Sequence, residues 1–315
     1  MKFTDELSLA VREVMMDPEF IARFKRGTAG KTLYVVPSTN DNYVDFVKTH
    51  QSYEDGTPSV YTTIQAAVNA LKSGWEVLVA PGSFDETVTV PHSISNIKIE
   101  SMGGRGATYI EPSTEDAAGM LVHADDVTLV NIGVAAEDET SAVALTVTGD
   151  RFRSYGSKFE GGAIQVLIGP GTVAQVAAGI RGKGSDSLFD DCEVCWGTKG
   201  IVLQGTDYGG CTQLMIRNCR FHDLTAESIG ENVGSGGSAA VTFFGLNVKD
   251  SVFELDEAGA APTKWLSLNA DNANSGIISG CRFPTAINGG LNLVSTKVLF
   301  VGNYMTGGIN TAQPS

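Results

Sequence analysis

Four carboxylates in neighbouring parts of the chain are the first candidates for chemistry. Asp190, Asp191 and Glu193 lie close together, and Asp223 follows further along the chain. Hydrolysis of a glycosidic bond needs two carboxyl groups about 5 to 10 Å apart, on either side of the scissile bond. These residues are therefore the candidate catalytic set. The alternative is that they lie on a solvated face and form ion pairs with basic neighbours.

Thiols and imidazoles are the other groups that could do chemistry, here by binding a metal. A C-x-x-C pair is formed by Cys192 and Cys195. A zinc site would need a second such pair or a histidine at ligand spacing, and Cys211 and Cys219 are too far apart to supply the pair. The histidines share no ligand spacing and are interpreted as surface or packing residues: His50, His92, His123 and His222. We expect no metal site and no cofactor.

An acidic run at 137–139 is the remaining metal candidate. It lacks the alternating ligands and the glycine of a calcium loop, so it is interpreted as a solvent-exposed loop.

The elements that must position these side chains follow from a repeat. Seven segments share an apolar-x-apolar pair, then a small turn-like residue, then an apolar endpoint. The endpoints are Val134, Phe159, Val194, Phe221, Phe253, Phe283 and Met305. They are between 22 residues (Phe283 to Met305) and 35 residues (Phe159 to Val194) apart. Such spacing is typical of a solenoid, in which each repeat buries its apolar face against its neighbours.

Alignment of the segments predicts which side chains point inward. The endpoint and the positions two, five and seven residues before it are expected to face the core. Cys192, Cys219 and Cys281 share the second of these positions, which predicts a buried ladder of small side chains. Two outward rows carry charges of both signs and predict ion-pair ladders. They consist of Asp190, Arg217 and Lys249, and of Lys158, Glu193 and Arg220.

Two helical patterns precede the repeats. The first 30 residues predict an arm of two short amphipathic helices. Its apolar side chains at helical spacing are the candidate attachment residues: Phe3, Leu7, Val11, Val14, Phe20 and Phe24. A strand at 31–36 and a polar loop at 37–59 follow. A further amphipathic helix at 61–71 is expected to cover the open end of the solenoid.

The stretch YTTIQAAVNALKSGWEVLVAPGSFDETVTV resembles the opening of right-handed parallel β-helix proteins of the pectin-lyase-like superfamily. The resemblance implies an all-β solenoid, a single-stranded right-handed parallel β-helix of about nine coils. Its expected divisions are a helical arm at 1–30, a strand, loop and capping helix at 31–75, the β-helix at 76–306, and a tail at 307–315.

The same resemblance leaves two functions open. Proteins of this fold include polysaccharide lyases and glycoside hydrolases, but the chain has no GHG or NTD motif to accompany Asp190 and Asp191. The first interpretation is a structural or adhesive phage virion protein. It would be a homotrimer, held to other virion proteins through residues 1–30, and would decorate a capsid or bind a host-surface glycan. The alternative is a polysaccharide depolymerase of the tail-spike type.

Composition narrows the partners. A net charge of -14 argues against nucleic acid and anionic membranes, which are bound by clustered Lys and Arg. Residues 1–30 show no signal-peptide pattern, and no apolar run is long enough for a membrane span. The protein is therefore expected to be made in a host cytoplasm and to reside in the virion. A periplasmic carbohydrate-binding β-helix is a weaker possibility, because it would need a signal peptide.

Overall fold

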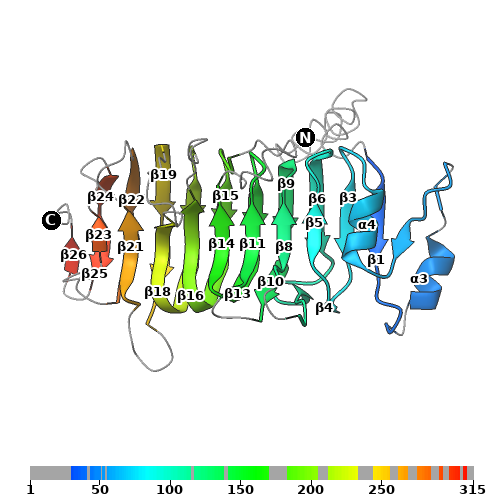
Figure 1. Ribbon diagram of the computed structural model, residues 1–315, viewed down its shortest axis with the longest axis horizontal. Helices are drawn as coiled ribbons and strands as arrows, with labels where there is room; N and C mark the ends of the chain where they lie inside the picture. The colour runs from blue at the N-terminus through cyan, green and yellow to red at the C-terminus, as the bar shows by residue number, and fades with distance from the viewer. Residues whose placement is uncertain are drawn as a thin grey trace, which may run out of the picture.

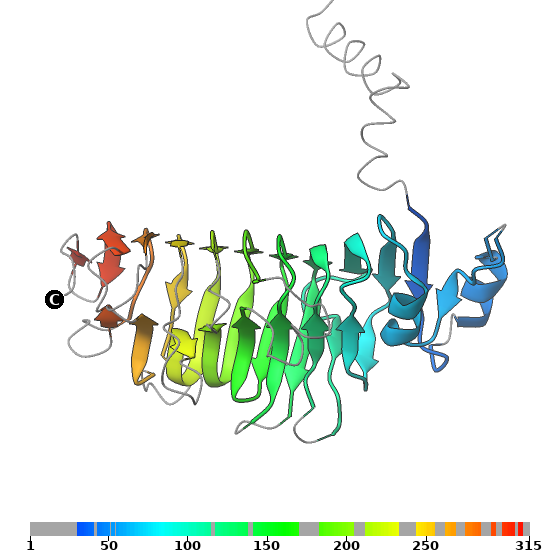
Figure 2. The ribbon, with the colours of Figure 1, turned by 45° about the horizontal axis from the view of Figure 1, so that its top comes forward.

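The computed structural model describes most of the chain from residue 30 onward. The described residues are 30–40, 43–50, 52–53, 55–114, 117–137, 141–169, 183–204, 212–232, 244–255, 262–268, 275–284, 291–293, 298–305 and 308–310. They form a right-handed parallel β-helix whose coils stack along one axis (Figures 1 and 2). Residues 1–29 of the predicted arm, with all of its attachment residues, lie outside the described residues, as do Cys211 and the predicted tail except for 308–310.

One long parallel sheet, which we call face A, runs the length of the stack. Its strands, in spatial order, are β2 (Val60–Tyr61), β1 (Thr32–Val35), β3 (Glu76–Val79), β6 (Ser95–Ser101), β9 (Asp125–Val130), β12 (Arg153–Tyr155), β15 (Leu188–Asp190), β17 (Met215–Arg217), β19 (Phe244–Lys249), β22 (Ser275–Ser279) and β24 (Val298–Val301). From β3 to β24 these are the nine predicted coils.

Two further ladders complete each coil. Face B contains β4 (Gly82–Phe84), β7 (Thr108–Ile110), β10 (Ile132–Ala136), β13 (Lys158–Gly161), β16 (Glu193–Gln204), β18 (Arg220–Asn232) and β20 (Val252–Phe253). Face C contains β5 (Val88–Val90), β8 (Met120–Val122), β11 (Val143–Val147), β14 (Ile164–Ile168), the distal parts of β16 and β18, β21 (Lys264–Leu268) and β23 (Leu291–Leu293). The long strands β16 and β18 therefore belong to both. The antiparallel pair β25 (Asn303–Met305) and β26 (Gly308–Asn310) lies at the C-terminal end.

The small turn-like residue of each repeat makes the corner between faces A and B. All seven have a positive φ between 50° and 66°: Asn131, Gly156, Asp191, Asn218, Asp250, Gly280 and Gly302. Asn, Asp and Gly tolerate this left-handed conformation better than other residues. The corner therefore explains why each segment carries one of these three residue types between its two apolar pairs.

The predicted inward rows are confirmed. Every one of their side chains is buried except Gly276 and Met305, which are partly buried. Phe221, Phe253 and Phe283 stack with ring centroids 4.9 and 4.5 Å apart. The cysteine ladder is also confirmed, with Cys192, Cys219 and Cys281 buried and free. These rows leave only the alternate, outward positions of faces A and B for function.

The N-terminal end is covered by α4 (Ile64–Ala70), as predicted for the capping helix (Figure 1). Thr63 is its N-cap, and the Glu86 carboxylate accepts from the Ile64 and Gln65 backbone N–H groups at 2.6 and 2.9 Å. Gln65 in turn pairs with the backbone of Thr89 at the edge of face C, at 2.6 and 3.3 Å. The helix thus covers the core and also satisfies an open strand edge.

One detail of the fold differs from the prediction. The segment at 37–59, predicted as a loop, contains the short helix α3 (Tyr43–Thr49). Its Val44 and Val47 side chains are exposed, so its valines form no buried apolar stripe that the sequence could have revealed.

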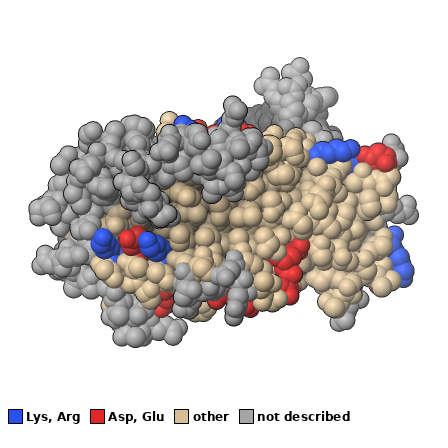
Figure 3. All heavy atoms as spheres, in the orientation of Figure 1, with Lys and Arg blue, Asp and Glu red and all other residues tan. Residues whose placement is uncertain are grey.

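Face C is almost free of charge in its central part, as Figure 3 shows. Its charged row is confined to Lys199, Glu227 and Lys264 near the C-terminal half. No described helix has the length and apolar character needed to cross a membrane.

Candidate functional site

The corner between faces A and B divides the four predicted carboxylates into two pairs. Asp190 ends β15 on face A, and Asp191 occupies the corner. Glu193 begins β16 on face B, and Asp223 lies in β18 of the next coil. The structure therefore brings Glu193 and Asp223 together and places the other two elsewhere.

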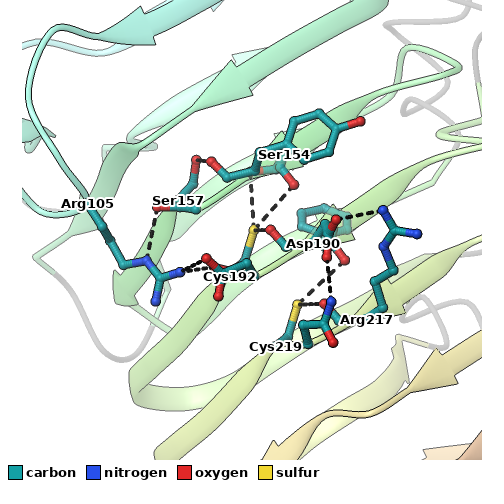
Figure 4. A network of polar contacts seen from close by, with 12 residues as sticks. Arg105, Ser154, Ser157, Asp190, Cys192, Arg217 and Cys219 are labelled. Carbon is teal, nitrogen blue, oxygen red and sulfur yellow. Dashed lines mark hydrogen bonds and ion pairs between the residues drawn. The ribbon is translucent and has the colours of Figure 1, made fainter. Parts of the chain in front are cut away.

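Asp190 and Asp191 make structural contacts. Arg217 and Asn218 of the next coil donate to Asp190 at 2.7 and 3.0 Å (Figure 4). The hydrogen bond from Arg217 holds the pKa of Asp190 below its usual value, which is unsuitable for a group that must donate a proton. Asp191 is well exposed and pairs with Arg105 at 2.6 Å. Arg105 also donates to the Gly156 carbonyl at 3.1 Å and so fastens successive corners together.

The predicted ion-pair ladders hold on one face only. On face A the pair of Asp190 and Arg217 is formed, whereas Lys249 lies nearest to Asp250, at 3.8 Å. On face B the expected ladder of Lys158, Glu193 and Arg220 is wrong. Lys158 pairs with Glu160 at 2.5 Å and Arg220 with Glu254 at 2.6 Å. Lys158 reaches the next outward position of its own strand and Arg220 reaches the next coil, which leaves Glu193 to a different partner.

That partner is His222, which lies between two carboxylates. Its Nε2 atom is 3.0 Å from Oε1 of Glu193, and its Nδ1 atom contacts Oδ2 of Asp223. A neutral imidazole has one N–H and one lone pair, so both contacts are satisfied only when the three groups share one further proton. The imidazole therefore lies between two carboxylates, with one carboxylate at each ring nitrogen.

Cys195 adds a buried thiol to this array. Its Sγ atom is 3.8 Å from Glu193 and 3.9 Å from Glu160. Burial raises the pKa of the Cys195 thiol, and the nearby carboxylates raise it further while Lys158 lowers it. For Lys158 itself burial opposes the charged form, but the hydrogen bond to Glu160 and the electrostatic effect of the neighbouring groups together outweigh burial, and the pKa of Lys158 is raised.

Trp196 closes the arrangement from the solvent side. Its indole N–H donates to Asp223 at 3.0 Å, and the Lys158 ammonium lies 4.5 Å from the ring centroid. Trp196 has a positive φ of 51°, a conformation that is strained for an aromatic residue and that is found preferentially at functional sites. The side chain is 49% exposed.

We call this set the His222 cluster: Lys158, Glu160, Glu193, Cys195, Trp196, His222 and Asp223. Its charged side chains and the imidazole are only 10 to 19% exposed, and Cys195 is fully buried. Shielding of this kind strengthens the electrostatic interactions within the cluster.

Sequence reasoning missed His222, Cys195, Glu160 and Trp196 as a group. Glu160, Cys195 and His222 each follow directly after an endpoint, and register stacks them on β13, β16 and β18. The segment alignment could therefore have revealed this row, had it been extended one residue past the endpoint. Of the other candidates, Glu137 is described, whereas 138–139 lie outside the described residues.

Comparison with known proteins gives similarity of structure only. No family model matches the sequence, and no curated protein matches it. Pectate lyase Pel9A aligns with a TM-score of 0.61 and 13% identity, over 87% of this chain and 69% of the other. Pectin methylesterase from carrot aligns with a TM-score of 0.54 and 14% identity, over 80% and 81%. Rice weevil pectin methylesterase aligns with 0.51 and 13%, over 89% and 92%.

These neighbours are parallel β-helix proteins of the pectin-lyase-like superfamily. The shared feature is the fold. The predicted parallel β-helix fold is confirmed, whereas the finer prediction of a phage virion protein receives no support from these neighbours.

Proposed function

We propose that this protein binds a polysaccharide along face B and cleaves it at the His222 cluster. The observation that carries the proposal is a shielded imidazole flanked by Glu193 and Asp223, directly beneath a half-exposed indole. The structural neighbours named for acting on pectin support a polysaccharide as the substrate class. The depolymerase alternative thus becomes the favoured function.

Trp196 supplies the binding surface. The flat apolar face of a sugar ring stacks on an aromatic side chain, and the hydroxyl groups at its edge donate to carboxylates. The basic side chains at this part of face B are already paired: Lys158 of the cluster with Glu160, and the neighbouring Arg220 with Glu254. Together with a net charge of -14 this favours a neutral glycan over a uronate polymer.

The chemistry needs a proton for the leaving oxygen and a carboxylate on the opposite side to activate water. We assign the donation of the proton to His222, whose two ring nitrogens contact Glu193 and Asp223, and the activation of water to one of these two carboxylates. The cluster therefore contains both a proton donor and a carboxylate base. Asp190 and Asp191 have no part in this proposal.

The first test measures release of reducing ends or unsaturated products from a panel of neutral and acidic surface glycans. Glu193→Gln and Asp223→Asn should each lower the rate of release by about 100-fold or more, whereas Asp190→Asn and Glu254→Gln should retain it. Absence of product from every glycan would refute cleavage, and an unchanged rate in Glu193→Gln would refute this site.

Binding is tested separately with Trp196→Ala. Loss of the stacking surface should weaken binding of a cleaved oligosaccharide about tenfold, as measured by calorimetry. Trp196→Phe should recover part of that affinity, and Met102→Ala, an exposed apolar residue outside the cluster, is the matched control. Equal affinity in all three variants would place the glycan on another surface.

A trimeric virion role is the second candidate, and one observation favours it. Met215, Ile277 and Leu299 are exposed in a single outward row of face A, on β17, β22 and β24. Asn247 lies between Met215 and Ile277 in this row, whereas Ile277 and Leu299 are direct neighbours. Exposed apolar side chains that lie close together mark a surface for protein contact. We propose side-by-side packing of β-helices through this row. Attachment through residues 1–30 and residence in a virion remain predictions.

A further inference from the structure

Three donor atoms of different chemical type converge within the His222 cluster. The ligand atoms of Glu193, Cys195 and His222 all lie within 4.8 Å of one another. They come from adjacent coils: Glu193 and Cys195 point outward from β16, and His222 lies beside Cys195 on β18. The C-x-x-C pair lacked a histidine in the sequence, and the register supplies one.

We propose that Glu193, Cys195 and His222 bind a zinc ion. A carboxylate oxygen, a thiolate sulfur and an imidazole nitrogen form a mixed ligand set that suits zinc and is too soft for calcium or magnesium. This inference goes beyond the proposed function, because metal binding needs no glycan.

The distances fit a tetrahedral site after small side-chain movements. With usual zinc–ligand bond lengths, neighbouring ligand atoms are about 3.3 to 3.6 Å apart. Here Glu193 Oε1 is 3.0 Å from His222 Nε2 and 3.8 Å from Cys195 Sγ. All three side chains stand on paired strands, so rotamer adjustment alone brings them to one ion.

Asp223 completes the arrangement around His222. A zinc-bound histidine usually donates its other ring N–H to a carboxylate, which fixes the tautomer and the orientation of the ring. The Nδ1 atom of His222 already contacts Oδ2 of Asp223, and the Trp196 indole N–H donates to the same oxygen. Nε2 is thereby aimed at Glu193 and Cys195.

The local charge also favours a cation. Glu160, Glu193 and Asp223 bring three carboxylates into the cluster, against the single ammonium group of Lys158. Shielded carboxylates in excess are costly unless a proton or a metal ion compensates them. A zinc ion would supply that compensation.

The test uses the full-length protein, stripped with a chelator and titrated with zinc in the absence of glycan. One zinc per chain is expected. Cobalt(II) in its place should give intense visible bands and a thiolate-to-cobalt absorption band. Cys195→Ser should abolish that band and His222→Gln should abolish tight binding, while Asp223→Asn should weaken binding about 10- to 100-fold.

Cys281→Ser is the matched control, because Cys281 is an equally buried free thiol far along the inner ladder. It should retain both the affinity and the cobalt band. Circular dichroism identifies any variant that fails to fold, and Cys195→Ala then serves as a second test of the thiol.

Absence of zinc binding, or a cobalt band that survives loss of Cys195, would overturn the proposal. A protein that cleaves glycan without binding zinc would refute only the metal site, and one that binds zinc but cleaves no glycan would refute only the proposed function.

Discussion

His222 owes its role to its place in the stack. Only Asp223 lies next to it in sequence, whereas Glu193 reaches it from the previous coil at 3.0 Å. Residue types alone predicted Glu193 and Asp223 as candidates together with Asp190 and Asp191, and the four cannot be separated without the corner at Asp191. The residues before and after a corner lie on different faces. Closeness in sequence therefore grouped Asp190 and Asp191 with Glu193 and Asp223, and it did not reveal that His222 lies beside Glu193.

Asp126 gives a prediction at the residue scale that depends on pH. Arg151 donates to both of its carboxylate oxygens, at 2.7 and 2.9 Å, and these bonds lower the pKa of Asp126 in the folded state. A carboxyl whose folded pKa is lowered contributes stability above its unfolded pKa of about 3.9 and loses it as the pH falls further. Asp126→Asn should therefore be less stable than the parent protein near neutral pH.

Urea unfolding at pH 7 and at successively lower pH measures this difference. The gap between Asp126→Asn and the parent should close as the pH falls below about 3.9. Lys48→Ala, which removes an exposed ion pair on α3, should leave the pH profile unchanged. A gap that is independent of pH would contradict the assignment.

At the scale of elements, the corner between faces A and B was predictable in position. The sequence marks it by one Asn, Asp or Gly in each segment, and the structure gives all seven a positive φ. The helix α3 and the long strands β16 and β18 were not predictable, because neither a seven-residue helix nor a continuation from face B to face C produces a distinct apolar period.

Gly302 allows the corner to be tested without side-chain clashes. Its φ is +61°, and a Cβ added there would meet no atom within 4 Å. Gly302→Val should cost about 1 to 2 kcal/mol of unfolding free energy, because a β-branched residue is strained in the left-handed region. Gly302→Asn should cost much less. Equal losses in thermal or urea unfolding would show that the corner conformation is not what selects these residues.

The capping helix gives a second prediction at this scale. Gln65 supplies both a donor and an acceptor to the backbone of Thr89, so Gln65→Ala leaves a partly buried N–H without its partner. The loss should be about 1 to 3 kcal/mol in urea unfolding. Hydrogen exchange should show the increase in opening first at β5. Lys48→Ala is again the surface control, and a loss no larger than that of the control would mean that α4 only shields the core.

For the whole molecule, the nine coils were predictable because every repeat must bury the same four positions, whereas lateral association depends on outward rows that no repeat rule fixes. The exposed row of Met215, Ile277 and Leu299 offers apolar side chains on face A that association would bury. Light scattering should give a trimer mass for the parent protein. A double variant, Ile277→Lys with Leu299→Lys, should shift the measured mass toward that of a monomer while the circular dichroism spectrum stays unchanged.

The control is Val44→Lys, because the Val44 side chain is also exposed but lies at the opposite end of the stack. This variant should stay trimeric. A monomeric parent would refute the trimer. A trimeric double variant would place the interface on another surface. Because face B lies around the corner from this row, trimers joined through face A leave the His222 cluster open to a long glycan, so cleavage and assembly are compatible in one molecule.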